Sequence, residues 1–503
     1  MGFELRFSDK EVTAWGGLAV MKQMLDHLDF AGALKRAQLP QPGSNRGYRP
    51  EQVLLQFIMS FWCGANRFAH NEITRHDTTL GKLFGITKMA NHQAITRLFQ
   101  RFSQPDNDRV FDSLYSWLFA QISLVRLTLD LDSTVMTRYG FQEGAVRGYN
   151  PGKKGRASHH PLMAFVSETR MMANFWLRPG NTGSANNVLA FFDSTLAHLG
   201  NKIVGLVRAD SGFAEAGFMK RLEADGTDYI ITLKLNYPLQ KALTRVSTGW
   251  VNIHKGIDVI SIMYQAPSWK QPRRVVGIRQ HVSIKPDAKG KNLSLFADDP
   301  IIKNYRYSAL VTTLKCAAED VWRTYRGRAD CENRIKELKY DFGADSFCLK
   351  NFWATEAALN TVMIGYNLMS LFRQAAADQG LHKDRDEDGE DGLTEVPDTQ
   401  PEHVKNEASA PDNAAQITQP AEIEKNSKEA RKEARKKRKK LAQSRLSTLR
   451  FKLFAKPGFL TKEGRKTVLN LAIASAQREW FEGLWNEAKS FAIPVKFKPA
   501  LYP

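Results

Sequence analysis

The chain has 503 residues, 43% of them apolar, and a formal net charge of +19 at pH 7. Its basic charge favours a polyanionic partner, nucleic acid before a membrane, although a generally basic protein would share the composition. There is no apolar run of about 18 residues and no N-terminal apolar core, so neither membrane spanning nor secretion is expected. Four scattered cysteines without a CxxC pair argue against a disulfide framework or a zinc site.

Apolar residues at helical spacing predict a mainly helical region over residues 1–123. Within it, residues 80–102 predict a short helix, a turn and a second helix, which is the order of a helix-turn-helix. Asn91, Gln93 and Arg97 lie near the start of the second helix and are residue types that bond to base edges. The region is therefore a candidate DNA-binding region, although an ordinary helical hairpin would have the same pattern.

Residues 127–135 alternate with period two and predict a strand. Asp130 and Asp132 share one face of it, so either could supply a carboxylate to a site there. A glycine-rich basic loop follows at 148–156. Its backbone amides and its cations could approach a phosphodiester, although a mobile hairpin loop with solubilising lysines would have the same sequence pattern. The cations are Lys153, Lys154 and Arg156.

The next segments predict a hairpin, a helix, a buried strand, a helix and a further strand, at 160–177, 184–199, 202–210, 214–224 and 229–235. Asp210 ends the buried strand. This order predicts an α/β fold with a ribonuclease-H-like mixed sheet, whose first part is 124–235 and whose last part is 319–374. The final helix of the fold is expected at residues 322–342, where it would carry a third acid.

The two parts of the core are separated by residues 236–318, whose short alternating runs predict an inserted β-rich subdomain. Residues 375–427 are acidic and polar and predict a disordered linker. Residues 428–503 predict a helical C-terminal region. It begins with the basic run 428–440 and contains an amphipathic helix at 464–491.

The helix expected at 322–342 has a distinctive charge pattern. Tyr325, Arg328, Glu332 and Lys339 fall within about 60° of one another at 100° per residue, and Lys336 shares that stripe. A single acid among cations suits one metal ligand with neighbours that hold phosphates, although a solvated helix could carry the same charges.

The spacing Tyr-x2-Arg-x3-Glu-x6-Lys resembles the signature of bacterial insertion-sequence transposases of the DDE type, in the branch that cuts DNA through hairpins. Asp132 precedes Ser-Thr, as the first aspartate of that family does, and the branch also has an insertion before the glutamate. The resemblance implies that Tyr325, Arg328 and Lys339 contact the DNA strand opposite the cut. Trp322 is a candidate for stacking on a base, and Lys336 for a further DNA contact.

Asp132, Asp210 and Glu332 are the candidate catalytic and metal-binding acids, in the order strand, strand, helix. Three converging carboxylates can hold two divalent cations of the Mg²⁺ kind, for which Mn²⁺ is expected to substitute, and two such ions suit phosphodiester chemistry. Asp130 is the rival for the first position and would otherwise support the site. Structural ion pairs would be the ordinary explanation for any one of these acids.

Together with these patterns, the resemblance implies a Mg²⁺-dependent transposase that binds double-stranded DNA, both the inverted repeats at the ends of its element and the target. By resemblance it would excise the element through hairpin intermediates and work as a homodimer on paired ends. It would act on the nucleoid in the bacterial cytoplasm. The alternatives are a ribonuclease-H-like DNA nuclease and a catalytically silent DNA-binding regulator. Metal-dependent nicking of an end-containing duplex would exclude the silent regulator.

Overall fold

The computed structural model describes residues 4–497, apart from 6, 8, 45–46, 255, 282–304, 379–443 and 491. The chain divides into two units, Met1–Phe372 with Arg445–Pro503, and Arg373–Ser444. In the second unit, Arg373 Nη1 donates a hydrogen bond to the Ser444 carbonyl at 2.7 Å. A membrane-spanning helix was sought among the described helices, and none is both long and apolar enough. The features below belong to the first unit.

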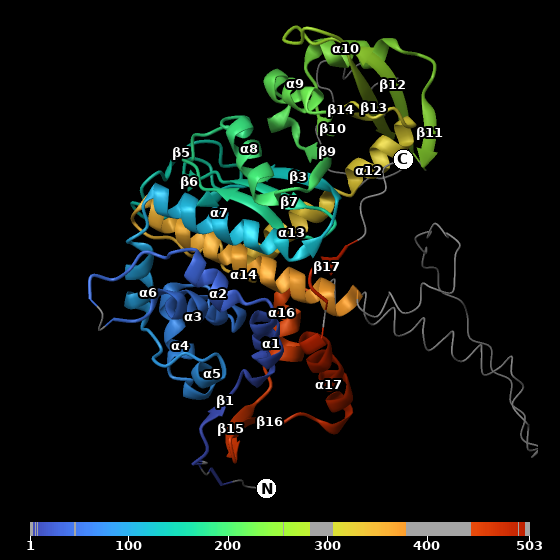
Figure 1. The fold of residues 1–503 in the computed structure, drawn as a ribbon. Coiled ribbons are helices and arrows are strands. Elements are labelled where there is room, and N and C mark those ends of the chain that lie inside the picture. Colours follow the sequence, from blue (N-terminus) through green and yellow to red (C-terminus); the bar gives the residue numbers. More distant parts are fainter. Residues whose placement is uncertain are drawn as a thin grey trace, which may run out of the picture. The chain divides into compact units, whose positions relative to one another are not determined.

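A nine-stranded mixed sheet forms the centre of this unit, in the order β11-β12-β13-β14-β10-β9-β3-β7-β8 (Figure 1). β3, β9 and β10 are parallel neighbours, and the other pairs are antiparallel. The prediction of an α/β fold with a mixed sheet is confirmed. The strands are β3 (Arg126–Ser133), β7 (Leu162–Val166), β8 (Met172–Trp176), β9 (Ile203–Ala209), β10 (Asp228–Thr232), β11 (Val251–His254), β12 (Ile257–Tyr264), β13 (Arg273–His281) and β14 (Tyr305–Thr312).

The first 120 residues are mainly helical, as their apolar spacing predicts. The helices are α1 (Ala19–His27), α2 (Phe30–Arg36), α3 (Pro50–Trp62), α4 (Asn71–Arg75), α5 (Thr78–Leu83), α6 (His92–Phe99) and α7 (Gln104–Ala120), with short 3-10 turns at Gly16–Leu18 and Phe68–His70. Those of the sheet region are α8 (Val188–Leu199), α9 (Ala216–Ala224), α10 (Tyr237–Arg245), α12 (Ala318–Arg326), α13 (Ala329–Tyr340) and α14 (Phe352–Asp378). The helix predicted from residue 184 therefore begins at Val188, after the left-handed residue Asn187.

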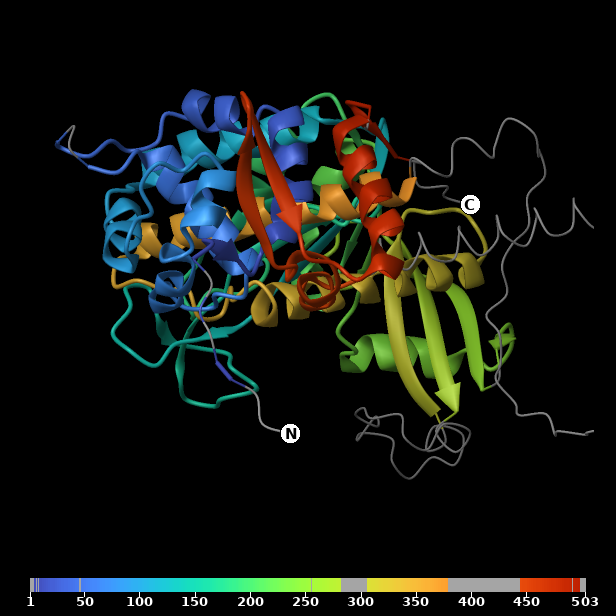
Figure 2. The same ribbon diagram turned by 90° about the horizontal axis from the view of Figure 1, so that it is seen from below.

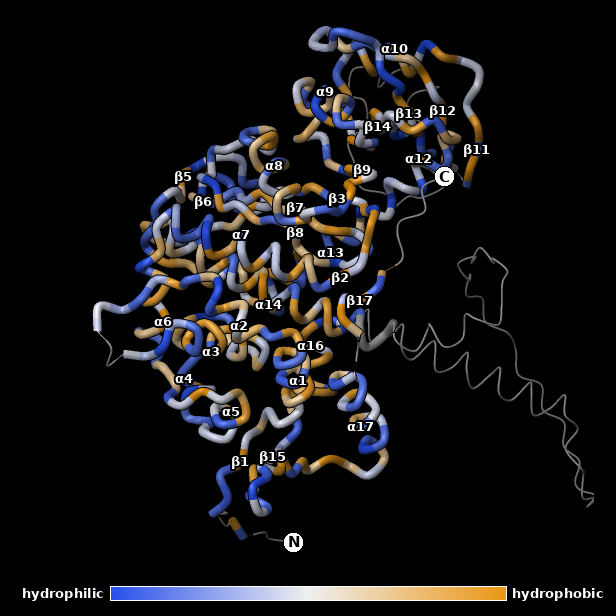
Figure 3. Tube along the Cα trace, in the orientation of Figure 1, coloured by the Kyte–Doolittle hydropathy of each residue, from blue (hydrophilic) through white to orange (hydrophobic). Residues whose placement is uncertain are grey.

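Helix α14 joins the N-terminal helices to the sheet. Trp62 Nε1 of α3 donates to the Gly365 carbonyl at 3.2 Å, and the Asn367 amide pairs with both backbone groups of Met172 in β8. A Cβ on Gly365 would lie 2.3 Å from the Phe61 ring, so only glycine permits this approach. Figure 3 shows hydrophobic residues along α14 and the strands above it, as expected for a helix that is buried on all sides.

The strands of the predicted insertion at 236–318 extend the central sheet through the pairing of β14 with β10. Val276 and Ile278 of β13 pack with Val321 of α12 in one apolar cluster. Gly277, between them, faces the opposite side, where an added Cβ would lie 2.5 Å from Leu243 of α10. Helices α12 and α10 therefore cover opposite faces of these strands (Figure 2).

The helical C-terminal region was predicted wrongly in part. Residues 458–471 form a hairpin of β15 (Gly458–Glu463) and β16 (Lys466–Leu471), turning at Gly464 with φ +60°. The helix predicted at 464–491 is shortened to α17 (Ser475–Ser490), because residues 466–471 pair along β15 instead. Before the hairpin come α16 (Leu446–Leu449) and a π-helical turn at Arg450–Phe454.

Short strands join parts of the chain that are distant in sequence. β1 (Val12–Thr13) pairs with β15, and β17 (Val495–Lys496) pairs with β2 (Ile122–Ser123). A separate three-stranded sheet contains β4 (Met136–Thr137), β6 (Ala157–His159) and β5 (Val146–Arg147). Helix α14 continues to Asp378, four residues into the predicted linker. The remainder of that linker and the basic run 428–440 lie outside the described residues.

A buried acid in α14 predicts a pH-dependent stability. The pKa of Glu356 is raised to about 7, mainly by burial and also by the nearby Asp108, while hydrogen bonds from Leu177 N and Asn107 Nδ2 oppose the rise. Because the folded pKa exceeds the unfolded value, the charged form destabilises the fold as pH rises from about 4.3 toward 7.

Glu356→Gln removes this titration, so its stability relative to the wild type should increase by about 2 kcal/mol between pH 5 and pH 8. Urea unfolding at the two pH values measures this difference. Glu319→Gln, on an exposed helix surface, is the control and should show no such trend. A pH-independent difference for Glu356→Gln would contradict the prediction.

Candidate active site

Two of the predicted acids lie at one edge of the sheet. β3 and β9 are parallel, with Leu131 opposite Ala209. Asp132 is the next residue of β3, and Asp210 directly follows β9. Because parallel neighbours end on the same side of a sheet, these two carboxylates share the edge where ligands of open α/β sheets commonly bind.

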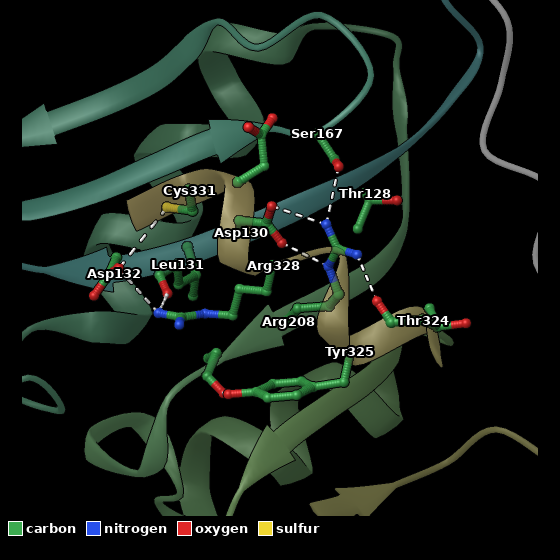
Figure 4. Close-up of polar contacts among 12 residues, drawn as sticks. Thr128, Asp130, Leu131, Asp132, Ser167, Arg208, Thr324, Tyr325, Arg328 and Cys331 are labelled. Carbon is green, nitrogen blue, oxygen red and sulfur yellow. Dashed lines mark hydrogen bonds and ion pairs between the residues drawn. The ribbon is translucent and has the colours of Figure 1, made fainter. Parts of the chain in front are cut away.

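The start of helix α13 lies against this edge. Arg328, its N-cap residue, places Nη2 3.1 Å from Asp132 Oδ2 and 3.0 Å from the Leu131 carbonyl (Figure 4). Cys331 Sγ lies 3.8 Å from the same carboxylate oxygen. Glu332 follows Cys331 in the first turn of α13 and is exposed. The helix thus carries the third acid to the ends of the two strands.

Asp132 experiences the charges of both other acids. Its side chain is buried, and this burial raises its pKa to about 6. The positive charge of Arg328 opposes the rise, whereas the negative charges of Asp210 and Glu332 add to it. Buried carboxylates whose pKa is raised by neighbouring negative charges are found most often at functional sites.

The donor set fits a divalent cation. Three carboxylates supply the hard oxygen ligands that Mg²⁺ prefers, and a cation would relieve their mutual repulsion. Within the described part of the chain, no three acids, histidines or cysteines already stand in metal-binding geometry. Asp132 Oδ2 is paired with Arg328, and Asp210 Oδ1 accepts a hydrogen bond from Gly212 N at 2.9 Å. Seating a metal would therefore require these two carboxylates to exchange partners.

Tyr325 of α12 reaches the same edge from the other side of the strand ends. Its hydroxyl accepts a hydrogen bond from Thr232 Oγ1 at 2.5 Å and lies 3.5 Å from the Ala209 carbonyl. Burial raises the pKa of the phenol, and Asp210 and Asp132 raise it further. In this structure the tyrosine is therefore tied to β9 and β10 beside the acids.

The single helix predicted at 322–342 is wrong, because α12 ends at Arg326 and α13 begins at Ala329. The cause is Arg208 of β9. Its Nη1 donates to the Thr324 carbonyl at 2.7 Å, which withdraws that carbonyl from the helical ladder. A Cβ on Gly327 would lie 2.6 Å from the same nitrogen, so glycine leaves the space that the guanidinium fills.

We expect Gly327→Ala to destabilise the protein by about 1–3 kcal/mol, since the added methyl group overpacks against a buried guanidinium. Gly483→Ala is the matched control, because a Cβ there meets nothing within 4 Å and the residue lies inside helix α17. It should stabilise the protein by about 0.4–1 kcal/mol. Urea unfolding of both variants measures the contrast, and equal effects would contradict this role for Gly327.

The structure separates the two candidate aspartates of β3. Asp130 is fully buried and accepts two hydrogen bonds from Arg208, at 2.7 Å from Nε and 2.9 Å from Nη2. Nη2 also donates to Ser167 Oγ at 2.9 Å. Asp130 therefore holds the arginine that contacts the α12–α13 junction (Figure 4).

The remaining residues of the motif differ in exposure. Lys339 Nζ donates to the Val135 carbonyl at 2.8 Å and lies 3.8 Å from Asp345 Oδ1. Lys336 is exposed on α13. Trp322 packs against the apolar cluster of β10 and β12–β14, and the Arg326 guanidinium lies 4.8 Å from its ring centroid.

The other predicted DNA contacts lie outside this cluster. The three cations of the 148–156 loop, Lys153, Lys154 and Arg156, are exposed. Gln93 and Arg97 are exposed on α6, whereas Asn91 caps that helix by accepting a hydrogen bond from Ala94 N at 2.8 Å.

Sequence patterns did not point to several side chains that build the site. Arg208 lies within a continuous apolar strand, where a buried cation has no periodic signal. Thr232 and Ser184 are common strand and loop residues, yet Ser184 Oγ bonds Ser133 Oγ at 2.8 Å beside Asp132. An isolated charge inside an apolar run is the one signal that could have marked Arg208.

A family model assigns the sequence to a known family. The sequence model of the family described as "Transposase DDE domain group 1" matches residues 2–384. One similar solved structure is the piggyBac transposase synaptic complex with hairpin DNA, with 13% identity, 74% of this chain and 79% of that chain covered, and a TM-score of 0.40. No curated protein matches the sequence. Because the family match extends over most of its length, the chain belongs to the DDE transposases of domain group 1.

Proposed function

We propose that this transposase moves a bacterial insertion sequence by cutting and pasting. It binds the terminal inverted repeats of its element, excises the element through hairpin intermediates and joins it to target DNA. Family membership implies DNA strand cleavage and transfer. The finer proposal is supported by the electrostatic influence of Asp210 and Glu332 on Asp132 at one sheet edge, beside the tyrosine and arginine of the spaced motif.

Within this proposal, Asp132, Asp210 and Glu332 hold two Mg²⁺ ions, or Mn²⁺ in their place. DDE transposases generally use divalent metal ions. When bound, such ions activate the attacking oxygen and stabilise the leaving oxygen of a phosphodiester. Arg328 orients the Asp132 carboxylate through their ion pair and the Leu131 contact. Release of that pair would free a guanidinium for a DNA phosphate.

The DNA contacts follow the family resemblance for the residues of the spaced motif, and the exposure of the side chains for the others. Tyr325, Arg328 and Lys339 contact the strand opposite the cut, Lys336 makes a further DNA contact, and Trp322 stacks on a base. Gln93 and Arg97 of α6 read the terminal repeat, while Asn91 fixes the start of that helix. The exposed cations of the 148–156 loop contact the DNA backbone.

We further propose the predicted domain division with a ribonuclease-H-like core. The parallel strands β3, β9 and β10, with antiparallel β7 and β8 and helix α13, support this core. A homodimer on paired DNA ends follows from the resemblance, and the substrate places the enzyme on the nucleoid of a bacterial cytoplasm.

The proposal is tested with a labelled duplex that contains the DNA flanking the gene. Short inverted repeats bracketing the gene identify the element ends. With Mg²⁺, we expect nicking at these ends and a hairpin product on denaturing gels, and no cleavage in EDTA. Cleavage independent of the end sequence would instead favour a ribonuclease-H-like nuclease. End binding without any nicking would favour a silent regulator.

A further inference from the structure

A second candidate binding site lies on the loop that follows β3, the strand that carries Asp132. A pocket of about 700 Å³ opens between the β4–β5 turn, strand β6 and the segment before α14. Tyr139, Phe141, Arg147, Arg156 and Lys350 are among its lining residues. We infer that this pocket binds an unpaired nucleotide of the DNA substrate, with Tyr139 and Phe141 stacking on the base and the cations holding its phosphates. The inference rests on the proposed function only in taking DNA as the ligand.

The aromatic side chains of the turn are unusually exposed. Phe141 is 99% exposed and Tyr139 72% exposed. Exposed rings of this size on a soluble surface favour a binding role over packing. Every nucleotide base offers a flat face to such a ring, and stacking of this kind tolerates any sequence.

The backbone that presents these rings is held in place. The Glu143 amide donates to the Lys350 carbonyl at 2.8 Å, and its carboxylate accepts a hydrogen bond from Phe352 N at 2.9 Å. Its carbonyl lies 2.9 Å from His159 Nε2. Gly144, with φ +76°, lets the turn close against the Phe352 ring, because an added Cβ would lie 2.6 Å from that ring. The rings therefore stand on an ordered turn and lose little freedom when they bind.

The charge of the pocket selects an anionic ligand. Its lining has four cations, Arg138, Arg147, Arg156 and Lys350, against the single acid Glu143. That carboxylate already caps the start of α14. Among the described residues, none forms an ion pair with Arg147, Arg156 or Lys350. The Arg156 guanidinium lies 5.7 Å from the Tyr139 ring centroid, which places a phosphate-binding group beside a stacking surface.

Paired DNA hides its base faces within the stack, so two protruding rings favour unpaired nucleotides. Strand cutting exposes such nucleotides, and strand β4 follows Asp132 after three residues. The Arg138 guanidinium also donates to the Asp345 carbonyl at 2.6 Å, which connects the β4–β6–β5 sheet to the segment that follows α13. The pocket is thus built onto the elements that carry the acids.

The test measures binding of a single-stranded oligothymidylate that contains one 2-aminopurine, using the full chain in EDTA. The wild type should bind it and quench its fluorescence. Tyr139→Ala/Phe141→Ala should weaken binding by at least about fivefold and reduce the quenching, since stacking on each ring contributes measurably to affinity. Phe451→Ala is the control, because Phe451 is similarly exposed at 81% but lies in the C-terminal π-helical turn.

A second measurement separates the cations from the rings. Arg147→Gln/Arg156→Gln should lower the slope of log affinity against log salt by about 0.7 for each phosphate that these side chains neutralise in the wild type. Arg465→Gln, exposed in the β15–β16 turn, should leave the slope unchanged. No binding by the wild type, or the same affinity, quenching and slope in the pocket variants, would overturn the inference. Because binding is measured without metal, a failure of the proposed cleavage chemistry would not alter these readings.

Discussion

Asp132→Ala, Asp210→Ala and Glu332→Ala are each expected to lower metal-dependent strand cleavage by about a thousandfold or more, while binding to element-end DNA persists. Each change removes one carboxylate from the sheet edge where the three charges interact. Metal stabilisation of a phosphodiester transition state contributes several kcal/mol, and each 1.4 kcal/mol corresponds to about tenfold in rate. Cleavage on denaturing gels and binding by anisotropy measure the two effects separately.

The control for this set is Glu319→Ala. Glu319 is an acid on the neighbouring helix α12, and it pairs with Arg323 on the surface. Loss of this surface pair should change stability by no more than about 1 kcal/mol and leave cleavage intact. Wild-type cleavage by any one of the three variants would remove that residue from the proposed metal site.

Arg208→Met is expected to destabilise the protein by about 3–5 kcal/mol, because it leaves the buried Asp130 carboxylate without its partner. Both side chains of this pair are almost fully inaccessible, at 6% and 0% exposed. The change also removes the donor to the Thr324 carbonyl at the α12–α13 junction. Urea unfolding measures the loss, and end cleavage should fall with it because α13 carries Glu332.

The double variant Asp130→Leu/Arg208→Met should recover part of this stability, since an apolar pair no longer buries a lone charge. Its cleavage should remain below that of the wild type, because the Thr324 contact is still missing. Lys22→Met, which breaks a surface pair with Asp26, is the control and should cost about 1 kcal/mol or less. A similarly small effect for Arg208→Met would contradict the role assigned to it.

Much of the sheet could be predicted because its signals are local. β3 alternates with period two and β9 is a short, mostly apolar run, and an acid lies at or directly after the end of each strand. The helix that carries Glu332 was predicted from the spaced motif, but the break between α12 and α13 was not. The cause of the interruption is a hydrogen bond to Thr324 from Arg208, which lies 116 residues earlier in the chain.

The C-terminal hairpin shows the same limit. Residues 464–491 contain enough apolar spacing to predict one helix, yet residues 466–471 pair with β15, which in turn pairs with Val12 and Thr13. A local sequence pattern does not reveal a strand partner that is distant in sequence, so the predicted helix began too early. The positions of the three acids could be assigned from the sequence and the family resemblance, and their catalytic roles stay a prediction.

The pairing of β1 with β15 has a consequence for biosynthesis. Val12 and Thr13 leave the ribosome long before their partners Phe459 and Gly458, which are distant in sequence. The segment that carries β1 therefore waits until the hairpin has been synthesised before its strand edge is covered. A polypeptide terminated before the hairpin would leave the strand edge of β1 unpaired. We expect such a polypeptide to associate with other chains through this edge.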